Sequence, residues 1–159
     1  MNILKWLDEN LEKFILCAFL SIMIVVMGIQ VTARYVLNSS LTWSEELTRF
    51  LFVWSAFLTL PYTIKFGLSL KIDQLLEVFP KGIRKFINII NHILMFVFFV
   101  FMFYHSTGVV QSAINSGQRS PALGIPMYIV QISSVVGFGL AAIRILQSLI
   151  ISLKKTKVA

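Results

Sequence analysis

The residues most able to do chemistry in this sequence lie in the segment TWSEELTR, residues 42–49. Thr42, followed three residues later by Glu45, matches a capping box, which predicts that a helix begins here. Glu45 and Glu46 precede Arg49 by four and three residues, so either carboxylate can neutralise the guanidinium on one helix face. The pattern is typical of a polar helix start that satisfies its own charges.

Two interpretations of this segment are open. The first is structural: a well-capped membrane helix that carries a tryptophan at the interface. The second is functional: a charged, aromatic surface for docking a partner, since two adjacent acids beside two arginines exceed what one helix end requires. The residues of this candidate surface are Arg34, Trp43, Glu45, Glu46 and Arg49.

No other group of residues suggests catalysis, a metal site or a cofactor. The sequence has no phosphate-binding glycine loop, no metal-ligand cluster and no nucleophile beside a base. His92 and His105 are 13 residues apart on one predicted helix, about 20 Å, so they cannot both ligate one haem. We predict a protein that is not an enzyme and has no cofactor; a membrane anchor for a redox enzyme is a minor alternative.

The composition places these residues in a membrane protein. Hydrophobic residues make up 57% of the 159 and charged residues 13%, against roughly 45–50% and 25% in soluble domains. Crossing a hydrocarbon core of about 30 Å takes about 20 helical residues. The predicted fold is all-α and integral to the membrane, a single domain of residues 1–159. Its four transmembrane helices are expected at about residues 14–34, 47–66, 86–109 and 126–151.

The distribution of lysine and arginine predicts the orientation. The net charge is +7, and the cations lie at the ends of apolar runs, which indicates a membrane surface and not a nucleic-acid partner. One side of a four-span arrangement would hold Lys5, Lys13, Lys65, Lys71, Lys81, Arg84, Lys85, Arg144, Lys154, Lys155 and Lys157. The other would hold Arg34, Arg49 and Arg119. Both termini are therefore predicted to be cytoplasmic, with Arg144 extending its side chain to the inner headgroups.

Two shorter stretches, residues 2–12 and 68–80, alternate apolar and charged residues at helical spacing. We predict that both are amphipathic helices lying on the membrane surface. In the last span, Gly137 and Gly139 with Ala141 and Ala142 form a small-residue face that a neighbouring helix can approach closely.

The acidic residues argue against a transport site within this chain. All seven lie outside the predicted spans: Asp8, Glu9, Glu12, Glu45, Glu46, Asp73 and Glu77. A proton-driven carrier needs an ionisable group that it can load and unload inside the membrane. An accessory subunit is the simplest reading of a four-span chain without one.

Several motifs together resemble a known family. They are Arg34-Tyr35, the run Leu41 to Arg49, Lys71-Ile72-Asp73 after a basic turn, and Ala122 to Pro126 before the last span. In these motifs and in its four spans the chain is similar to the small, DctQ-type membrane subunit of tripartite ATP-independent periplasmic (TRAP) transporters, with the layout closest to the sialic-acid type. It departs at Ser69, where members often have histidine.

The resemblance implies a bacterial inner-membrane protein that works with two partners. One is a large many-span membrane subunit that carries the substrate and sodium sites. The other is a periplasmic binding protein that delivers an organic acid such as sialic acid or a dicarboxylate. The small subunit would brace the large one and help to dock the binding protein, with Asp73 a further interface candidate. The alternative is a self-sufficient homo-oligomeric transporter or channel.

Overall fold

A computed structural model of the chain describes residues 3–66 and 81–157. Its elements are the helices α1 (Ile3–Val36), α2 (Thr42–Lys65), α4 (Lys81–Ser116) and α5 (Met127–Lys157). The predicted surface helix at residues 68–80, with Ser69 and Asp73, lies outside the described residues. The other predicted surface helix, residues 2–12, is continuous from Ile3 with the first span, and its place on the membrane surface stays a prediction.

Each of the four helices is long and apolar enough to cross a membrane. The candidate spans are Leu11–Val36, Thr42–Lys65, Phe86–Ser116 and Met127–Ile150. They overlap the four predicted spans, so the all-α integral membrane fold is confirmed. A helix satisfies its own backbone hydrogen bonds, so a helical structure is expected for such apolar segments in lipid.

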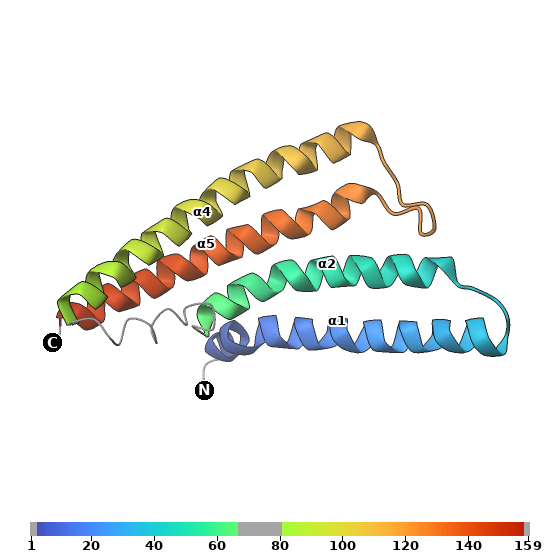
Figure 1. Cartoon of the computed structure of the whole chain (residues 1–159), viewed down its shortest axis with the longest axis horizontal. Helices are drawn as coiled ribbons and strands as arrows, with labels where there is room; N and C mark the ends of the chain where they lie inside the picture. The colour runs from blue at the N-terminus through green and yellow to red at the C-terminus, as the bar shows by residue number, and fades with distance from the viewer. Residues whose placement is uncertain (1–2, 67–80, 158–159) are drawn as a thin grey trace.

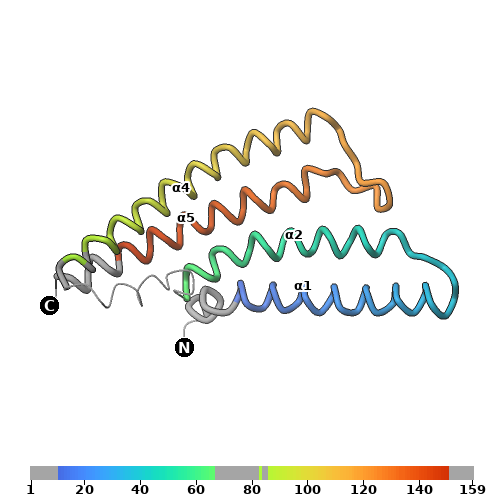
Figure 2. Tube along the Cα trace, in the orientation of Figure 1, coloured from blue at the N-terminus to red at the C-terminus, as the bar shows by residue number. Residues whose placement is uncertain are grey.

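The four helices lie side by side in one layer, in the order α1, α2, α5, α4 (Figure 1). α1 pairs with α2, α2 with α5, and α5 with α4, and Figure 2 shows the same order in the chain trace. The α1–α2 and α4–α5 connections lie at one end of the layer, here called the loop end. The start of α1 and the end of α5 lie toward the opposite end, here called the terminal end.

Small residues of α5 allow its neighbours to pack closely. A Cβ atom at Gly137 would lie 2.7 Å from the Cβ of Phe57 on α2, and one at Gly139 would lie 3.1 Å from the Phe103 ring of α4. Ala141 is fully buried in the same region. Lipid tails are as apolar as the side chains, so the hydrophobic effect contributes little to helix association in a membrane. Close van der Waals packing of this kind stabilises helix pairs instead. The small-residue face therefore packs within the layer.

The helices differ in how much of them the layer covers. Within an apolar 18-residue stretch of each span, 28% of residues are buried in α5 and 17% in α2, against 11% in α1 and in α4, because α5 and α2 each have a neighbour on both sides. Large apolar side chains such as Ile24 of α1 and Phe101 of α4 are exposed. The edges and broad faces of the layer are thus free for lipid or for another protein.

Candidate functional site

The start of α2 is built differently from the predicted capping box. Leu41 occupies the N-cap position, and no side chain caps the helix. The capping-box prediction for Thr42 and Glu45 is wrong, because Thr42 is already the first helical residue and the Glu45 carboxylate binds a neighbouring helix. The backbone N–H of Ser44 donates to the Leu41 carbonyl at 3.2 Å.

Glu45 connects α2 to α1. Its Oε1 accepts a hydrogen bond from Nε2 of Gln30 at 2.6 Å. The Ser44 hydroxyl lies 2.7 Å from Oε1 of Gln30 and 2.6 Å from the Leu41 carbonyl, and its single proton can serve either acceptor. Gln30 is 4% exposed and Ser44 is fully buried. Buried polar groups are costly unless hydrogen-bonded, so this network ties α1 to α2.

Glu46 connects α2 to the loop that precedes α5. Its Oε2 accepts two backbone hydrogen bonds, from the N–H groups of Ala122 at 3.0 Å and Leu123 at 2.8 Å. Hydrogen bonds to a charged acceptor are stronger than neutral ones. Glu46 is 8% exposed. Glu46, which directly follows Glu45, therefore binds a loop that lies 76 residues later in the sequence.

The loop is shaped so that these two amides face one acceptor. The backbone N–H of Ser120 donates to the Ile125 carbonyl at 2.9 Å, and the N–H of Gly124 donates to the Ser120 carbonyl at 3.0 Å. The Ser120 hydroxyl also accepts from the Ile125 N–H at 3.1 Å. Gly124 has φ of +67°, a left-handed conformation that glycine adopts without strain. The closed turn presents residues 122 and 123 to Glu46.

Arg49 is not neutralised by its own helix, contrary to the sequence prediction. Among the described residues no carboxylate lies within 4.0 Å of its guanidinium, because Glu45 and Glu46 are directed toward Gln30 and the loop. Arg49 is exposed and lines a cleft of about 390 Å³. The other residues around this cleft are Thr42, Glu45, Glu46, Pro121 and Ala122.

Arg34 and Trp43 lie at the same end of the layer but outside this cleft. Arg34 is exposed in the last turn of α1, and Trp43 is 39% exposed near the start of α2. In the described part of the chain neither side chain forms a hydrogen bond or ion pair. The structure therefore brings together Glu45, Glu46 and Arg49 of the predicted surface and leaves these two apart.

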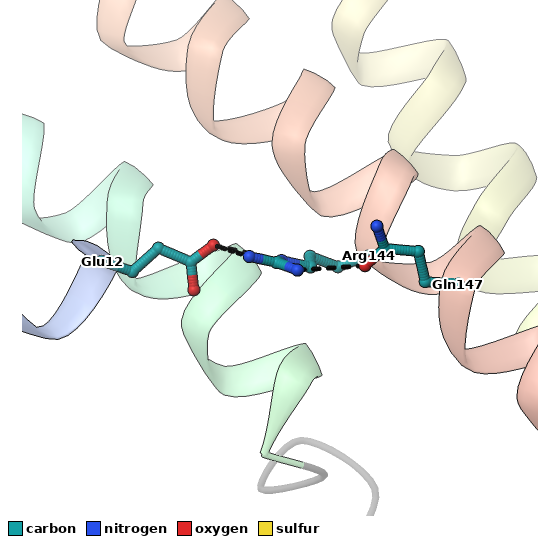
Figure 3. Close-up of polar contacts among 3 residues, drawn as sticks. All are labelled: Glu12, Arg144 and Gln147. Atoms are coloured by element: carbon teal, nitrogen blue, oxygen red, sulfur yellow. Dashed lines mark hydrogen bonds and ion pairs between the residues drawn. The ribbon is translucent and has the colours of Figure 1, made fainter. Parts of the chain in front are cut away.

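A second polar site, near the terminal end, was not predicted. Arg144 of α5 binds Oε1 of Glu12 on α1, with its NH2 atom at 2.8 Å and Nε at 3.1 Å (Figure 3). Its NH1 atom donates to Oε1 of Gln147 at 3.0 Å. The side chains of Arg144 and Glu12 are 12% and 8% exposed. The ion pair adds a partner within the chain to the predicted approach of Arg144 to the inner headgroups, which stays a prediction.

Glu12 is the second residue of the candidate span Leu11–Val36, whereas the predicted span begins at about residue 14. Its second oxygen, Oε2, is buried and has no hydrogen-bond partner among the described residues. The sequence did contain a signal. Arg144 follows Pro126 by 18 residues and Glu12 precedes Arg34 by 22, which places both at similar depths below the loop end.

The family described as tripartite ATP-independent periplasmic transporters, DctQ component, matches residues 23–155. The chain belongs to this family.

The relatives whose names state a substrate differ widely in length. The chain is 32% identical over 154 residues to the isethionate TRAP transporter permease protein DctMQ of Oleidesulfovibrio alaskensis, covering 93% of this chain and 24% of that protein. It is 26% identical over 140 residues to the ectoine TRAP transporter small permease protein TeaB of Halomonas elongata, covering 88% and 72%. The sialic acid TRAP transporter permease protein SiaT of Haemophilus influenzae is 34% identical over 105 residues, covering 66% and 16%.

The DctQ family is a transporter permease subunit and not an enzyme, which confirms that prediction. The histidines of this DctQ-type chain have structural surroundings. His92 lies with Nδ1 2.8 Å from the Asn88 carbonyl and Nε2 3.2 Å from the Ser148 hydroxyl. The His105 ring packs against the Phe101 ring in a tilted arrangement, with ring centroids 4.3 Å apart.

Proposed function

We propose that this chain is the accessory scaffold subunit of a sodium-coupled TRAP importer for an organic acid. It would brace the large transport subunit and help to dock the periplasmic binding protein. One observation carries the proposal. Each acid whose side chain the structure describes, Glu12, Glu45 and Glu46, is bound by another residue of this chain. Carboxylates that hold helices and a loop together are suited to a rigid support.

The large subunit as partner is supported by the relatives and by the open layer. This chain matches only 24% of the length of the isethionate permease protein DctMQ and 16% of SiaT. A unit of this size is therefore joined to much longer sequence in those proteins. The broad apolar faces of the layer offer enough uncovered surface for a second membrane protein to pack against.

The proposed location is the bacterial inner membrane, with both termini in the cytoplasm. The excess of cations near the terminal end supports this orientation. The loop end, with Arg34, Trp43 and the cleft, would then face the periplasm and the binding protein. Asp73 and residues 68–80 would lie on the cytoplasmic side.

Co-purification tests the scaffold proposal. The full chain, tagged at its C-terminus, would be extracted from native membranes in mild detergent and its companions identified by mass spectrometry. We expect one stoichiometric, much larger many-span protein. A chain that purifies alone or with itself, and that transports solute when reconstituted alone in liposomes, would instead establish a self-sufficient homo-oligomeric transporter.

The solute needs its own experiment, because the substrates named for the relatives differ. The chain with its large subunit and binding protein would be reconstituted in liposomes and offered sialic acid, a C4-dicarboxylate, isethionate and ectoine. We expect uptake of an organic acid, sialic acid or a dicarboxylate, that requires a sodium gradient. Uptake unaffected by sodium would contradict the proposed coupling.

A further inference from the structure

Arg49 is a charged residue of a helix that can span the membrane, and it forms no ion pair with an acid among the described residues. It follows Trp43 by six residues, which places it about 9 Å further along α2. Both residues belong to the candidate span Thr42–Lys65, and with Trp43 at the interface, where tryptophan is enriched, the Arg49 backbone would lie on its membrane side. A guanidinium at that depth is unfavourable unless it extends toward the headgroups or meets an anion. Its exposed side chain is free to do both.

The cleft beside Arg49 carries both signs of charge. Glu45 and Glu46 line it together with the guanidinium. Glu45 uses Oε1 for Gln30, and among the described residues no donor contacts its Oε2. The Thr42 hydroxyl at the rim likewise forms no hydrogen bond in the described part of the chain. The Arg49 side of the cleft is thus suited to an anion, and the side with Glu45 and Thr42 is suited to a cation that carries N–H donors.

We propose that this cleft binds the headgroup of a zwitterionic aminophospholipid, with its phosphate on Arg49 and its ammonium group on Glu45 and Glu46. Arginine matches phosphate oxygens with two parallel hydrogen bonds. A primary ammonium group has three N–H donors, which the free carboxylate oxygen and the Thr42 hydroxyl can accept. The proposal rests on the cleft and its membrane depth, and it is independent of the scaffold function.

The charges favour a lipid over an acidic side chain of a partner protein. A partner carboxylate approaching Arg49 would enter a cleft that already holds two carboxylates, and like charges at close range repel. A zwitterion neutralises both walls at once. The size of the cleft agrees with this choice. A volume of about 390 Å³ can hold a lipid headgroup, but it is too small for a partner helix, which with its side chains is about 10–12 Å across.

Native mass spectrometry of the full chain, purified with whatever subunit accompanies it, tests this assignment. The delipidated protein would be titrated with phosphatidylethanolamine, phosphatidylcholine and phosphatidylglycerol of identical acyl chains. We expect phosphatidylethanolamine to bind at least tenfold more tightly than the other two. Phosphatidylcholine lacks ammonium N–H donors, and phosphatidylglycerol lacks the cation.

Two matched variants locate the site. Arg49→Gln should weaken phosphatidylethanolamine binding at least tenfold and leave the unfolding temperature unchanged, since Arg49 forms no ion pair in the described chain. Arg34→Gln removes another exposed arginine at the same end, outside the cleft, and should leave binding unchanged. Equal binding of all three lipids, or equal losses in both variants, would overturn the proposal. So would unchanged lipid binding in Arg49→Gln accompanied by loss of the large partner, which would assign Arg49 to a protein contact.

Discussion

Glu12 of α1 and Arg144 of α5 form an ion pair at 2.8 Å although α2 lies between their helices in the layer. The pair therefore links two helices that make no extensive direct contact, at the level where Ile64 near the end of α2 packs against α5. In a low-dielectric setting such a pair is favourable only while both charges are present.

Removing one member of this pair should destabilise the protein strongly. Glu12→Ala removes the carboxylate that neutralises the largely buried Arg144, and the expected loss is about 3–5 kcal/mol. Thermal unfolding in detergent measures it. Lys13→Ala, which removes the neighbouring exposed charge, is the control and should change stability by under about 0.5 kcal/mol. Equal effects of the two substitutions would show that the pair contributes nothing specific.

Glu46 should protect two particular backbone amides from hydrogen exchange. Glu46→Ala removes the acceptor of the Ala122 and Leu123 N–H groups, so exchange there should accelerate, with a stability loss of about 3 kcal/mol. Glu46→Gln keeps an acceptor oxygen and should have a smaller effect. Glu45→Ala, next in sequence, breaks the contact with Gln30 and should leave these two amides protected. The prediction fails if Glu45→Ala exposes them equally.

Gly137 and Gly108 should respond in opposite ways to alanine. At Gly137 the new methyl group would overlap Phe57, forcing α2 and α5 apart at a cost of about 1–3 kcal/mol. At Gly108 a Cβ atom would meet nothing within 4 Å, so Gly108→Ala should be neutral or stabilising by up to about 1 kcal/mol, the difference in helix propensity. Unfolding temperatures of both variants measure this. Similar shifts in both would mean that the close approach of α2 and α5 is not real.

Glu45 and Arg49 should behave as independent residues in a double-mutant cycle. They lie four apart on α2 but share no ion pair, so the coupling between Glu45→Gln and Arg49→Gln should be under about 0.5 kcal/mol. Stability measured in lipid-free detergent gives the value, because it removes any headgroup bridging the two. A coupling above about 1 kcal/mol would restore the pairing that helical spacing suggests.

The spans were predictable from sequence, and their neighbours were not. Four apolar runs of sufficient length determine four membrane helices, since lipid leaves the backbone no alternative. In soluble proteins a polar face identifies the outside of a helix, but here lipid-facing residues such as Ile24 and packed ones such as Ile145 are equally apolar. The order α1, α2, α5, α4 therefore cannot be derived from the apolar pattern, although the small-residue face of α5 did mark a packed surface.

The polar contacts were predictable in type and not in partner. Helical spacing correctly placed Glu45, Glu46 and Arg49 at the start of one helix. It wrongly paired them with each other, because spacing along one helix contains no information about acceptors and donors on its neighbours. Glu46 instead binds amides 76 and 77 residues later. The pairing of Arg144 with Glu12 was missed for the same reason: sequence gives the depth of each charge but not which helices adjoin.

The single layer of described helices has a consequence for solute passage. An aqueous conduit needs protein walls on every side, and four helices arranged edge to edge form only one wall. One copy of this arrangement cannot surround a permeating molecule, whatever residues line its faces. Any route that such a layer borders must be closed by other protein, from a partner or from further copies of itself.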